Sequence, residues 1–194
     1  MERVETGIQT IHGVFTMICY EDGSGLPDFA LVHGNVSGQS RVITRVQSEC
    51  LTGHVFHSLS CDCYEQLHDS LKAITCEARG VLIYLRQEGR GIGLSAKMRS
   101  YILQRQGLDT VEANVRLGYG ADERTYDAAA RILQDLEVQS IVLLTNNPEK
   151  DSALRQQGVS VVEVIGVPPT VREQNKRYLT TKVVKMGHRF VIPT

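Results

Sequence analysis

Hydrophobic periodicity changes near residue 64, and this change restricts the folds available to the 194-residue chain. Before it, apolar or alternating runs separated by turn-forming segments predict β-strands at 14–20, 29–33 and 42–46. After it, segments of helical spacing alternate with short apolar runs, which predict buried strands at 81–85 and 141–144 and a further strand at 159–164. The predicted fold class is therefore mixed α/β: an N-terminal β-rich part followed by alternating strands and helices around a mixed sheet.

Apolar residues three or four positions apart predict the helices of the second part. The first helix is expected to stop before Gly80, and the fourth is expected to span 148–157. The apolar positions that define the first three are Leu67, Leu71 and Ile74, then Leu94, Met98 and Ile102, then Tyr126, Ala129, Leu133 and Leu136. We expect a single domain over 1–194, in which the basic, proline-bearing stretch 167–194 is a surface tail.

The amino-acid composition limits the cellular compartment and the binding partners expected for this chain. Lys and Arg total 21 against 22 Asp and Glu, and a net charge of −1 argues against binding along a nucleic-acid backbone. No apolar run approaches the roughly 18 residues of a membrane span, and the N-terminus lacks the layout of a signal peptide. We therefore expect a cytoplasmic protein with no membrane or nucleic-acid partner. Five cysteines are an odd count for a disulfide framework, and Cys19 and Cys76 are expected to be packing residues.

The other three cysteines, Cys50, Cys61 and Cys63, have the spacing C-x10-C-x-C. In a C-x-C on extended chain both thiols point to one side, and a loop can return a third thiol to complete three corners of a tetrahedron. Zn²⁺ favours thiolate ligands, and a catalytic zinc site keeps its fourth position for water. The spacing leaves open a structural zinc site with a histidine as fourth ligand, or three reduced cysteines in the core. The nearby histidines are His54, His57 and His68.

Two predicted strand–helix junctions carry groups suited to phosphate. The glycines of Arg86-Gln-Glu-Gly-Arg-Gly-Ile-Gly-Leu94 allow an anion to approach the backbone at a helix N-terminus. In Thr145-Asn-Asn-Pro-Glu-Lys150, Asn147 is the predicted N-cap and Pro148 the first helical residue. Lys150 in that first turn opposes the helix dipole, and a bound anion would resolve the conflict. The alternatives to phosphate binding are that the glycine-rich segment is a flexible turn and that Lys150 is an exposed lysine.

A third junction, Asp122-Glu-Arg-Thr125, is predicted to open the third helix, with Asp122 as its N-cap. Arg124 would then lie in the first turn, where a cation is again unfavourable. On the second helix, Tyr101 is expected at the edge of the apolar stripe, roughly 60° from Met98 at about 100° per residue. A core tyrosine and a functional tyrosine are both compatible with that position.

Taken together, these segments resemble the GTP cyclohydrolase II family, which opens riboflavin biosynthesis. The resemblance covers about residues 10–190. It is carried in order by Ser48-Glu-Cys-Leu-Thr-Gly53, Cys61-Asp-Cys63, Arg86–Leu94, Asp109-Thr-Val-Glu-Ala-Asn114, Asp122-Glu-Arg124, Leu144-Thr-Asn-Asn-Pro148 and Lys185-Met-Gly-His188. Some members carry a dihydroxybutanone phosphate synthase domain upstream, for which this chain has no room, so we expect the monofunctional form.

The resemblance implies hydrolysis of GTP with opening of the imidazole ring. The products would be formate, pyrophosphate and 2,5-diamino-6-ribosylamino-4(3H)-pyrimidinone 5′-phosphate. It implies one Zn²⁺ per chain on Cys50, Cys61 and Cys63, Mg²⁺ with the triphosphate, and a homodimer. The implied catalytic residues are Asp122 as proton acceptor, Arg124 at the α-phosphorus and Tyr101 near the reacting ring. The implied substrate-binding residues are Arg45, Glu49, Gln66, Glu88, Gly89, Arg90, Thr110, Thr145 and Lys150.

The sequence departs from the usual family pattern close to the predicted zinc ligands. That pattern reads roughly R-V-H-S-E-C-L-T-G-D, followed by S-x-R-C-D-C-G. Here Gln47 replaces the histidine, His54 the aspartate, Ser60 the arginine and Tyr64 the glycine. Since groups around a metal tune it and orient its ligands, the alternatives are a divergent paralogue, which stops at the formylated intermediate or serves a secondary-metabolite pathway, and a nucleotide-binding protein without turnover.

Overall fold

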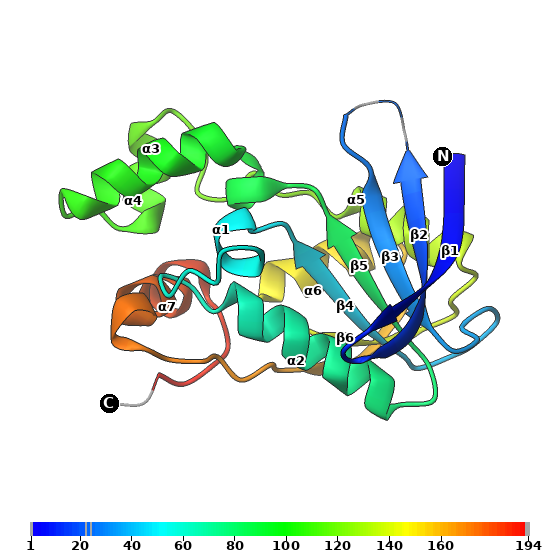
Figure 1. Ribbon diagram of the computed structural model, residues 1–194. Coiled ribbons are helices and arrows are strands. Elements are labelled where there is room, and N and C mark those ends of the chain that lie inside the picture. Colours follow the sequence, from blue (N-terminus) through cyan, green and yellow to red (C-terminus); the bar gives the residue numbers. More distant parts are fainter. Residues whose placement is uncertain (1, 22, 24, 193–194) are drawn as a thin grey trace.

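The computed structural model describes residues 2–21, 23 and 25–192, which form one seven-stranded mixed sheet with helices on both faces (Figure 1). The strand order is β1-β2-β3-β5-β4-β6-β7. The strands are β1 (Glu2–Thr10), β2 (Gly13–Glu21), β3 (Asp28–His33), β4 (Val42–Ser48), β5 (Gly80–Leu85), β6 (Ile141–Leu144) and β7 (Val161–Ile165). The helices are α1 (Leu51–His54), α2 (Cys63–Cys76), the 3₁₀ turn η1 (Glu88–Gly91), α3 (Leu94–Arg105), α4 (Thr110–Arg116), α5 (Asp127–Asp135), α6 (Pro148–Gln156) and α7 (Glu173–Met186).

The direction of the strands changes in the middle of the sheet, and this confirms the predicted mixed architecture. Strands β1, β2, β3 and β5 pair antiparallel, whereas β4 pairs parallel with both β5 and β6, and β6 parallel with β7. Parallel neighbours need long crossover connections, which α2 and α6 provide. Because parallel strands end at the same edge, the loops that follow β4, β5 and β6 meet there.

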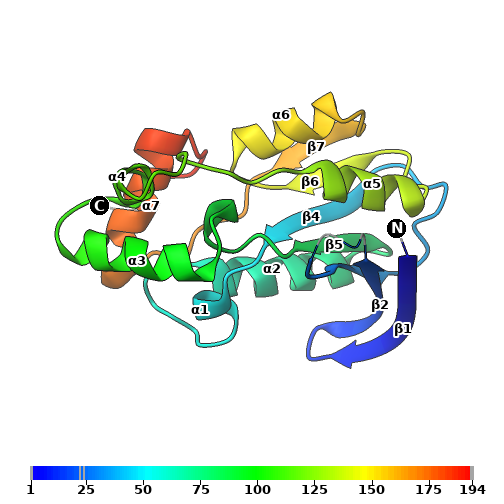
Figure 2. The same cartoon turned by 90° about the horizontal axis from the view of Figure 1, so that it is seen from above.

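Two hydrophobic clusters cover the two faces of the sheet. Figure 2 shows α2 on one face and α5 and α6 on the other. Strand β5 supplies both, since successive side chains point to opposite faces. Val81 and Ile83 belong to the larger cluster, under α5 and α6, whereas Leu82 packs with Phe15 and Ile74 beneath α2. The sheet is therefore buried on both sides at its centre, which explains why β5 and β6 are short apolar runs without alternation.

The strands and helices predicted from periodicity are present, with shifted ends. Helix α2 ends at Cys76, and Gly80 opens β5 instead of terminating the helix. Cys76 is exposed, so the packing role expected for it is wrong. Strand β1 and helix α4 were not predicted, because the mostly polar segment 2–10 and the seven-residue segment 110–116 carry no apolar period.

The stretch 167–194, expected as a surface tail, contains helix α7, which was not predicted either. Leu179 of this helix is fully buried, and α7 contacts α4. Helices α3 and α4 stand away from the sheet (Figure 1). Among the described residues, no helix is both long and apolar enough to cross a membrane.

Candidate functional site

Three cysteine thiols meet beyond the end of β4. Cys50 follows that strand, while Cys61 and Cys63 lie at the start of α2, and the three Sγ atoms all fall within 4.8 Å of one another. The Sγ atoms of Cys50 and Cys61 are 3.9 Å apart. Ligands about 2.3 Å from a tetrahedral zinc lie roughly 3.8 Å from each other, so the separation fits a shared metal ion.

A glycine makes the approach of the three thiols possible. A Cβ added to Gly53 would lie 3.0 Å from the Sγ of Cys61 and 3.2 Å from that of Cys50. Any side chain there would push the thiols apart. The glycine in the segment Ser48–Gly53, which resembles the family motif, is thus required for close packing of the thiols.

The thiols also interact electrostatically. Hydrogen bonds from Cys61 and Cys63 lower the pKa of Cys50 far below its ordinary value, and Lys97 adds to this effect. The same contact with Cys50 raises the pKa of Cys63. A divalent cation bound between them would allow all three thiols to ionise.

His54, one of the four departures from the family pattern, is not part of the thiol cluster. Its Nδ1 accepts from the backbone N–H of Cys50 at 3.3 Å and lies 2.8 Å from the Tyr84 hydroxyl. Its Nε2 lies 3.3 Å from Nε2 of Gln47, a second departure. These two substitutions contact each other, and the other two lie elsewhere: Ser60 lines the pocket, whereas Tyr64 stacks between His57 and His68.

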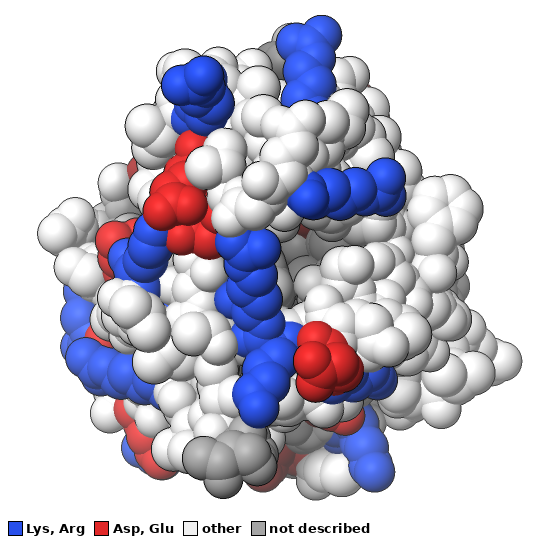
Figure 3. Space-filling view, turned by 90° about the vertical axis from the view of Figure 1, so that its left-hand side faces the viewer, with Lys and Arg blue, Asp and Glu red and all other residues white. Residues whose placement is uncertain are grey.

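The thiol cluster opens on a cavity of about 360 Å³ between the sheet edge, α3 and α7. Figure 3 shows this face of the molecule, with Lys and Arg side chains gathered along its middle. The cavity is lined by all the residues for which the sequence predicted a site role except Asp122, namely Arg45, Glu49, Cys50, Cys61, Cys63, Gln66, Glu88, Gly89, Arg90, Tyr101, Thr110, Arg124, Thr145 and Lys150.

Buried cations crowd one end of this cavity. Lys150 donates to the backbone carbonyl of Val46 at 2.5 Å and lies 5.6 Å from the centre of the Tyr126 ring. Burial, followed by repulsion from Arg45 and Arg124, lowers the pKa of Lys150 well below its ordinary value. Within the described residues no carboxylate pairs with Lys150, so this end of the cavity is suited to an anion of high charge.

The loop before α5 places Arg124 and Asp122 differently from the prediction. The helix begins at Asp127 with Tyr126 at the N-cap position, so neither Asp122 nor Arg124 belongs to its first turn. Instead Arg124 donates through Nε to Oδ1 of Asp122 at 2.8 Å. Burial raises the pKa of Asp122, but the pairing with Arg124 lowers it by more, so the pKa lies below its ordinary value. The carboxylate therefore stays ionised beside the cavity. At the other junction, Asn147 caps α6 and Pro148 is its first residue, as predicted.

The glycine-rich segment turns sharply around the cavity. Gly89 and Arg90 have φ of 65° and 64°, a left-handed conformation that is unfavourable for arginine. Arg90 reaches Thr110 on α4, where its Nη2 donates to Oγ1 at 2.9 Å. The strained turn thereby places a guanidinium and a hydroxyl on one side of the pocket, which suits phosphate.

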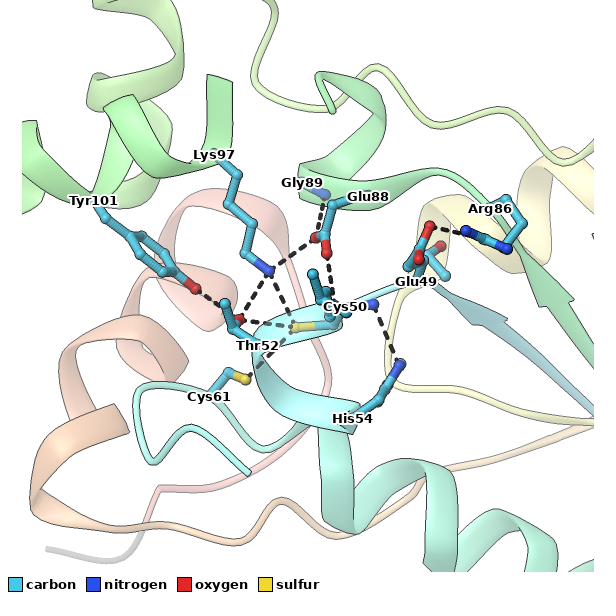
Figure 4. A network of polar contacts seen from close by, with 12 residues as sticks. Glu49, Cys50, Thr52, His54, Cys61, Arg86, Glu88, Gly89, Lys97 and Tyr101 are labelled. Atoms are coloured by element: carbon cyan, nitrogen blue, oxygen red, sulfur yellow. Dashed lines mark hydrogen bonds and ion pairs between the residues drawn. The ribbon is translucent and has the colours of Figure 1, made fainter. Parts of the chain in front are cut away.

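Tyr101 faces the thiol cluster and not the core. Its hydroxyl lies 3.3 Å from Oγ1 of Thr52, two residues after Cys50 (Figure 4). The inward face of α3 is polar, since Lys97 and Ser100 are buried there, whereas Leu94, Met98 and Ile102 are exposed. Because the polar side of α3 faces inward, Tyr101 lines the cavity instead of the core.

Sequence reasoning missed several residues of the cavity. Lys97, Tyr178 and Lys182 line it, and so does His188, whose buried Nε2 has no hydrogen-bond partner among the described residues. Lys97 and Tyr101 are four positions apart, a spacing that could have indicated a shared helix face. The contributions of α7 had no such signal, because that helix was not predicted.

Fold and site define the class: a mixed α/β protein whose three-cysteine cluster opens on a cation-lined pocket. Comparison with known families matches residues 2–166 to GTP cyclohydrolase II. The chain is 49% identical over 181 residues to the GTP cyclohydrolase-2 of Neisseria meningitidis serogroup A, covering 93% of this chain and 92% of that protein. The chain belongs to the GTP cyclohydrolase II family.

Other relatives are longer. The riboflavin biosynthesis protein RibBA of Bacillus cytotoxicus is 49% identical over 188 residues, which are 96% of this chain and 47% of that protein. The RibBA of Bacillus mycoides is 50% identical over 187 residues with the same coverage. The chain thus spans about half the length of these relatives.

Proposed function

We propose that the protein hydrolyses GTP with opening of the imidazole ring. It would release formate and pyrophosphate and yield 2,5-diamino-6-ribosylamino-4(3H)-pyrimidinone 5′-phosphate, as the first step of riboflavin biosynthesis in the cytoplasm. One observation carries the proposal: the three-thiol cluster and the crowded cations open on the same cavity of about 360 Å³. A ligand with a reactive ring at one end and a polyphosphate at the other would fit both.

At the cation end, Arg45, Arg124 and Lys150 would hold the triphosphate, which Mg²⁺ accompanies as part of the substrate. Asp122 holds Arg124 in place. Burial lowers the pKa of Arg124, but the pairing with Asp122 raises it by more, so the pKa lies above its ordinary value. A guanidinium that stays protonated stabilises charge at the α-phosphate while pyrophosphate leaves. Asp122, which is ionised, can accept a proton there.

At the thiol end, Cys50, Cys61 and Cys63 would hold Zn²⁺, which makes hydroxide available near neutral pH for attack at C8 of guanine. Gln66 and Glu49 also line the cavity. Tyr101, directed toward the cluster, would assist loss of the formyl group by hydrogen bonding or proton transfer. General acid–base groups of this kind contribute about 10²–10⁴-fold.

The decisive experiment incubates the purified protein with GTP and Mg²⁺ and measures formate and pyrophosphate. We expect both products, and we expect Cys61→Ser to abolish formate release while some pyrophosphate release remains. Cys76→Ser is the matched control, since this cysteine is exposed and outside the cluster. Absence of formate from the wild type, or equal rates for the two variants, would contradict the proposal.

A second candidate, a divergent enzyme that releases the formylated intermediate, is favoured by the Gln47–His54 contact beside Cys50. Mass spectrometry of the product separates the two. With Tyr101 present, we expect the deformylated pyrimidine from the wild type. Tyr101→Phe should slow complete turnover and accumulate the formylated species, with little change in GTP affinity.

We further propose that the protein is a homodimer. The exposed apolar residues Leu94, Met98 and Ile102 lie along one side of α3, a helix that stands away from the sheet. A second copy of the chain would cover them and support the helix that carries Tyr101.

A further inference from the structure

Lys97 is a buried cation that the proposed reaction does not use. It is 8% exposed and lies on the inward face of α3. Its Nζ donates to Sγ of Cys50 at 3.2 Å, to Oγ1 of Thr52 at 3.0 Å and to Oε1 of Glu88 at 2.8 Å (Figure 4). An ammonium group has three N–H donors, so these three partners leave none for a substrate phosphate.

Glu88 fixes the ammonium group on the side of the thiol cluster. Its Oε2 accepts from the backbone N–H of Leu51 at 2.6 Å, and its Oε1 accepts from that of Gly89 at 2.6 Å. The carboxylate is 7% exposed and joins α1 to the glycine-rich turn. Lys97 therefore cannot swing toward the cation end of the cavity without leaving a buried carboxylate partly unpaired.

Charge explains why a lysine stands beside Cys50. Three thiolates around a divalent cation carry a net charge of −1, which is unfavourable in a buried site. An ammonium group 3.2 Å from one thiolate offsets part of this charge, which it shares with the Glu88 carboxylate, and its N–H···S hydrogen bond withdraws electron density from the sulfur. Groups in this position around a metal centre orient the ligands and tune the metal.

We propose that Lys97 is a positioning residue of the metal centre, whose ammonium group holds the Cys50 thiolate and the Thr52 hydroxyl and offsets part of the negative charge of the three-cysteine site. The Thr52 hydroxyl also contacts Tyr101 at 3.3 Å, so the same group links the metal ligands to the catalytic tyrosine. This inference rests on the proposed metal-dependent function.

The test compares Lys97→Met, which removes the charge at similar length, with Lys97→Arg, which keeps it. Lys72→Met on α2 is the control, because that lysine is exposed and outside the cavity. Zinc affinity is measured by competition with a chromophoric chelator. We expect Lys97→Met to bind zinc about 10–100-fold more weakly, as is typical when a group supporting a metal ligand is lost. Lys97→Arg should recover part of this loss, and Lys72→Met should match the wild type.

A second measurement follows the thiolate itself. In the Co²⁺-substituted protein, loss of the N–H···S bond leaves Cys50 more electron-rich, so the thiolate-to-cobalt absorption should move to longer wavelength in Lys97→Met. If that variant does not fold, Lys97→Arg decides, because a planar guanidinium does not reproduce three diverging N–H bonds; its cobalt band should still shift.

Wild-type zinc affinity together with an unchanged cobalt band would overturn the role of Lys97. That result differs from failure of the proposed function, in which the wild type itself would bind no zinc through Cys50, Cys61 and Cys63.

Discussion

At the scale of single residues, two buried lysines show how environment decides the role of a charge. Lys97 has Cys50 and Glu88 beside it. Burial lowers the pKa of Lys97, but these two groups raise it by more, so the pKa lies above its ordinary value. Lys150 has a backbone carbonyl and is surrounded by other cations, so its pKa falls. The charge of Lys97 is satisfied by the protein, whereas that of Lys150 is suited to an incoming anion.

Lys150→Met should therefore separate binding from stability. Removing this lysine relieves repulsion from Arg45 and Arg124, so we expect the thermal midpoint to stay the same or rise. It also removes a charged contact to phosphate worth about 1.5–3 kcal/mol, which corresponds to a rise in KM for GTP of roughly 10–100-fold. Calorimetry and steady-state kinetics measure the two effects. An unchanged KM would exclude Lys150 from the phosphate site.

His188 gives a prediction for pH. Burial, followed by repulsion from Lys182, lowers the pKa of His188 to about 3, whereas a histidine in an unfolded chain titrates at about 6.5. Below about pH 6.5 the unfolded chain therefore binds a proton that the folded protein does not. This contribution to stability is complete above that pH and is lost as the pH falls toward 3.

The matched variant is His188→Gln, which cannot be protonated. Urea unfolding between pH 7 and 4 should show the wild type losing stability relative to the variant, by at most about 1.4 kcal/mol per pH unit. Parallel curves for the two proteins would show that His188 does not titrate differently on unfolding.

At the scale of elements, the contact between β4 and β5 places the two loops that carry Cys50 and Glu88 side by side. Gly80 makes this pairing close: an added Cβ would lie 2.6 Å from Cγ2 of Ile43 and 2.9 Å from its backbone oxygen. The strands could not accommodate a methyl group there without moving apart. The register that holds the site therefore depends on a glycine distant from it.

Gly80→Ala should destabilise the protein by about 1–3 kcal/mol, the range for overpacking a buried site. Gly7→Ala in β1 is the control, because a Cβ there meets nothing within 4 Å and a strand tolerates alanine. Denaturant midpoints of the two variants give the comparison. Equal midpoints would mean that the two strands separate easily.

At the scale of the whole molecule, helices α3 and α4 form an arm with an apolar outer side. Ile102 is 56% exposed there, while Lys97 and Tyr101 on the inner side complete the cavity. An arm of this kind is better supported in an assembly, which links the proposed homodimer to the site. In our proposal, the positions of Lys97 and Tyr101 in the cavity therefore depend on contacts between α3 and a second copy of the chain.

Ile102→Lys should weaken the dimer, because it places a charge on the apolar side of α3. Light scattering after gel filtration should show a dimeric wild type and a variant that becomes monomeric on dilution. Val184→Lys on α7 is the control, since that residue is 74% exposed on another helix. A monomeric wild type, or a variant as dimeric as the control, would contradict the proposed interface.

The sequence alone determined the features that depend on local periodicity and spacing. The apolar runs at β5 and β6 predicted buried strands, Asn147 and Pro148 predicted the start of α6, and the spacing of Cys50, Cys61 and Cys63 predicted a cluster of thiols. Each of these signals lies within a short stretch of the chain, from two residues at the start of α6 to fourteen for the cysteines.

Only the tertiary structure decided which distant groups meet. It showed α3 with its polar side inward, which brings Lys97 to Cys50, 47 positions away. It also placed α7 and His188 against the cavity. Local patterns could not reveal these contacts, because a helix buries its polar side only where the neighbouring chain supplies partners for each charge, and those partners are set by the path of the whole chain.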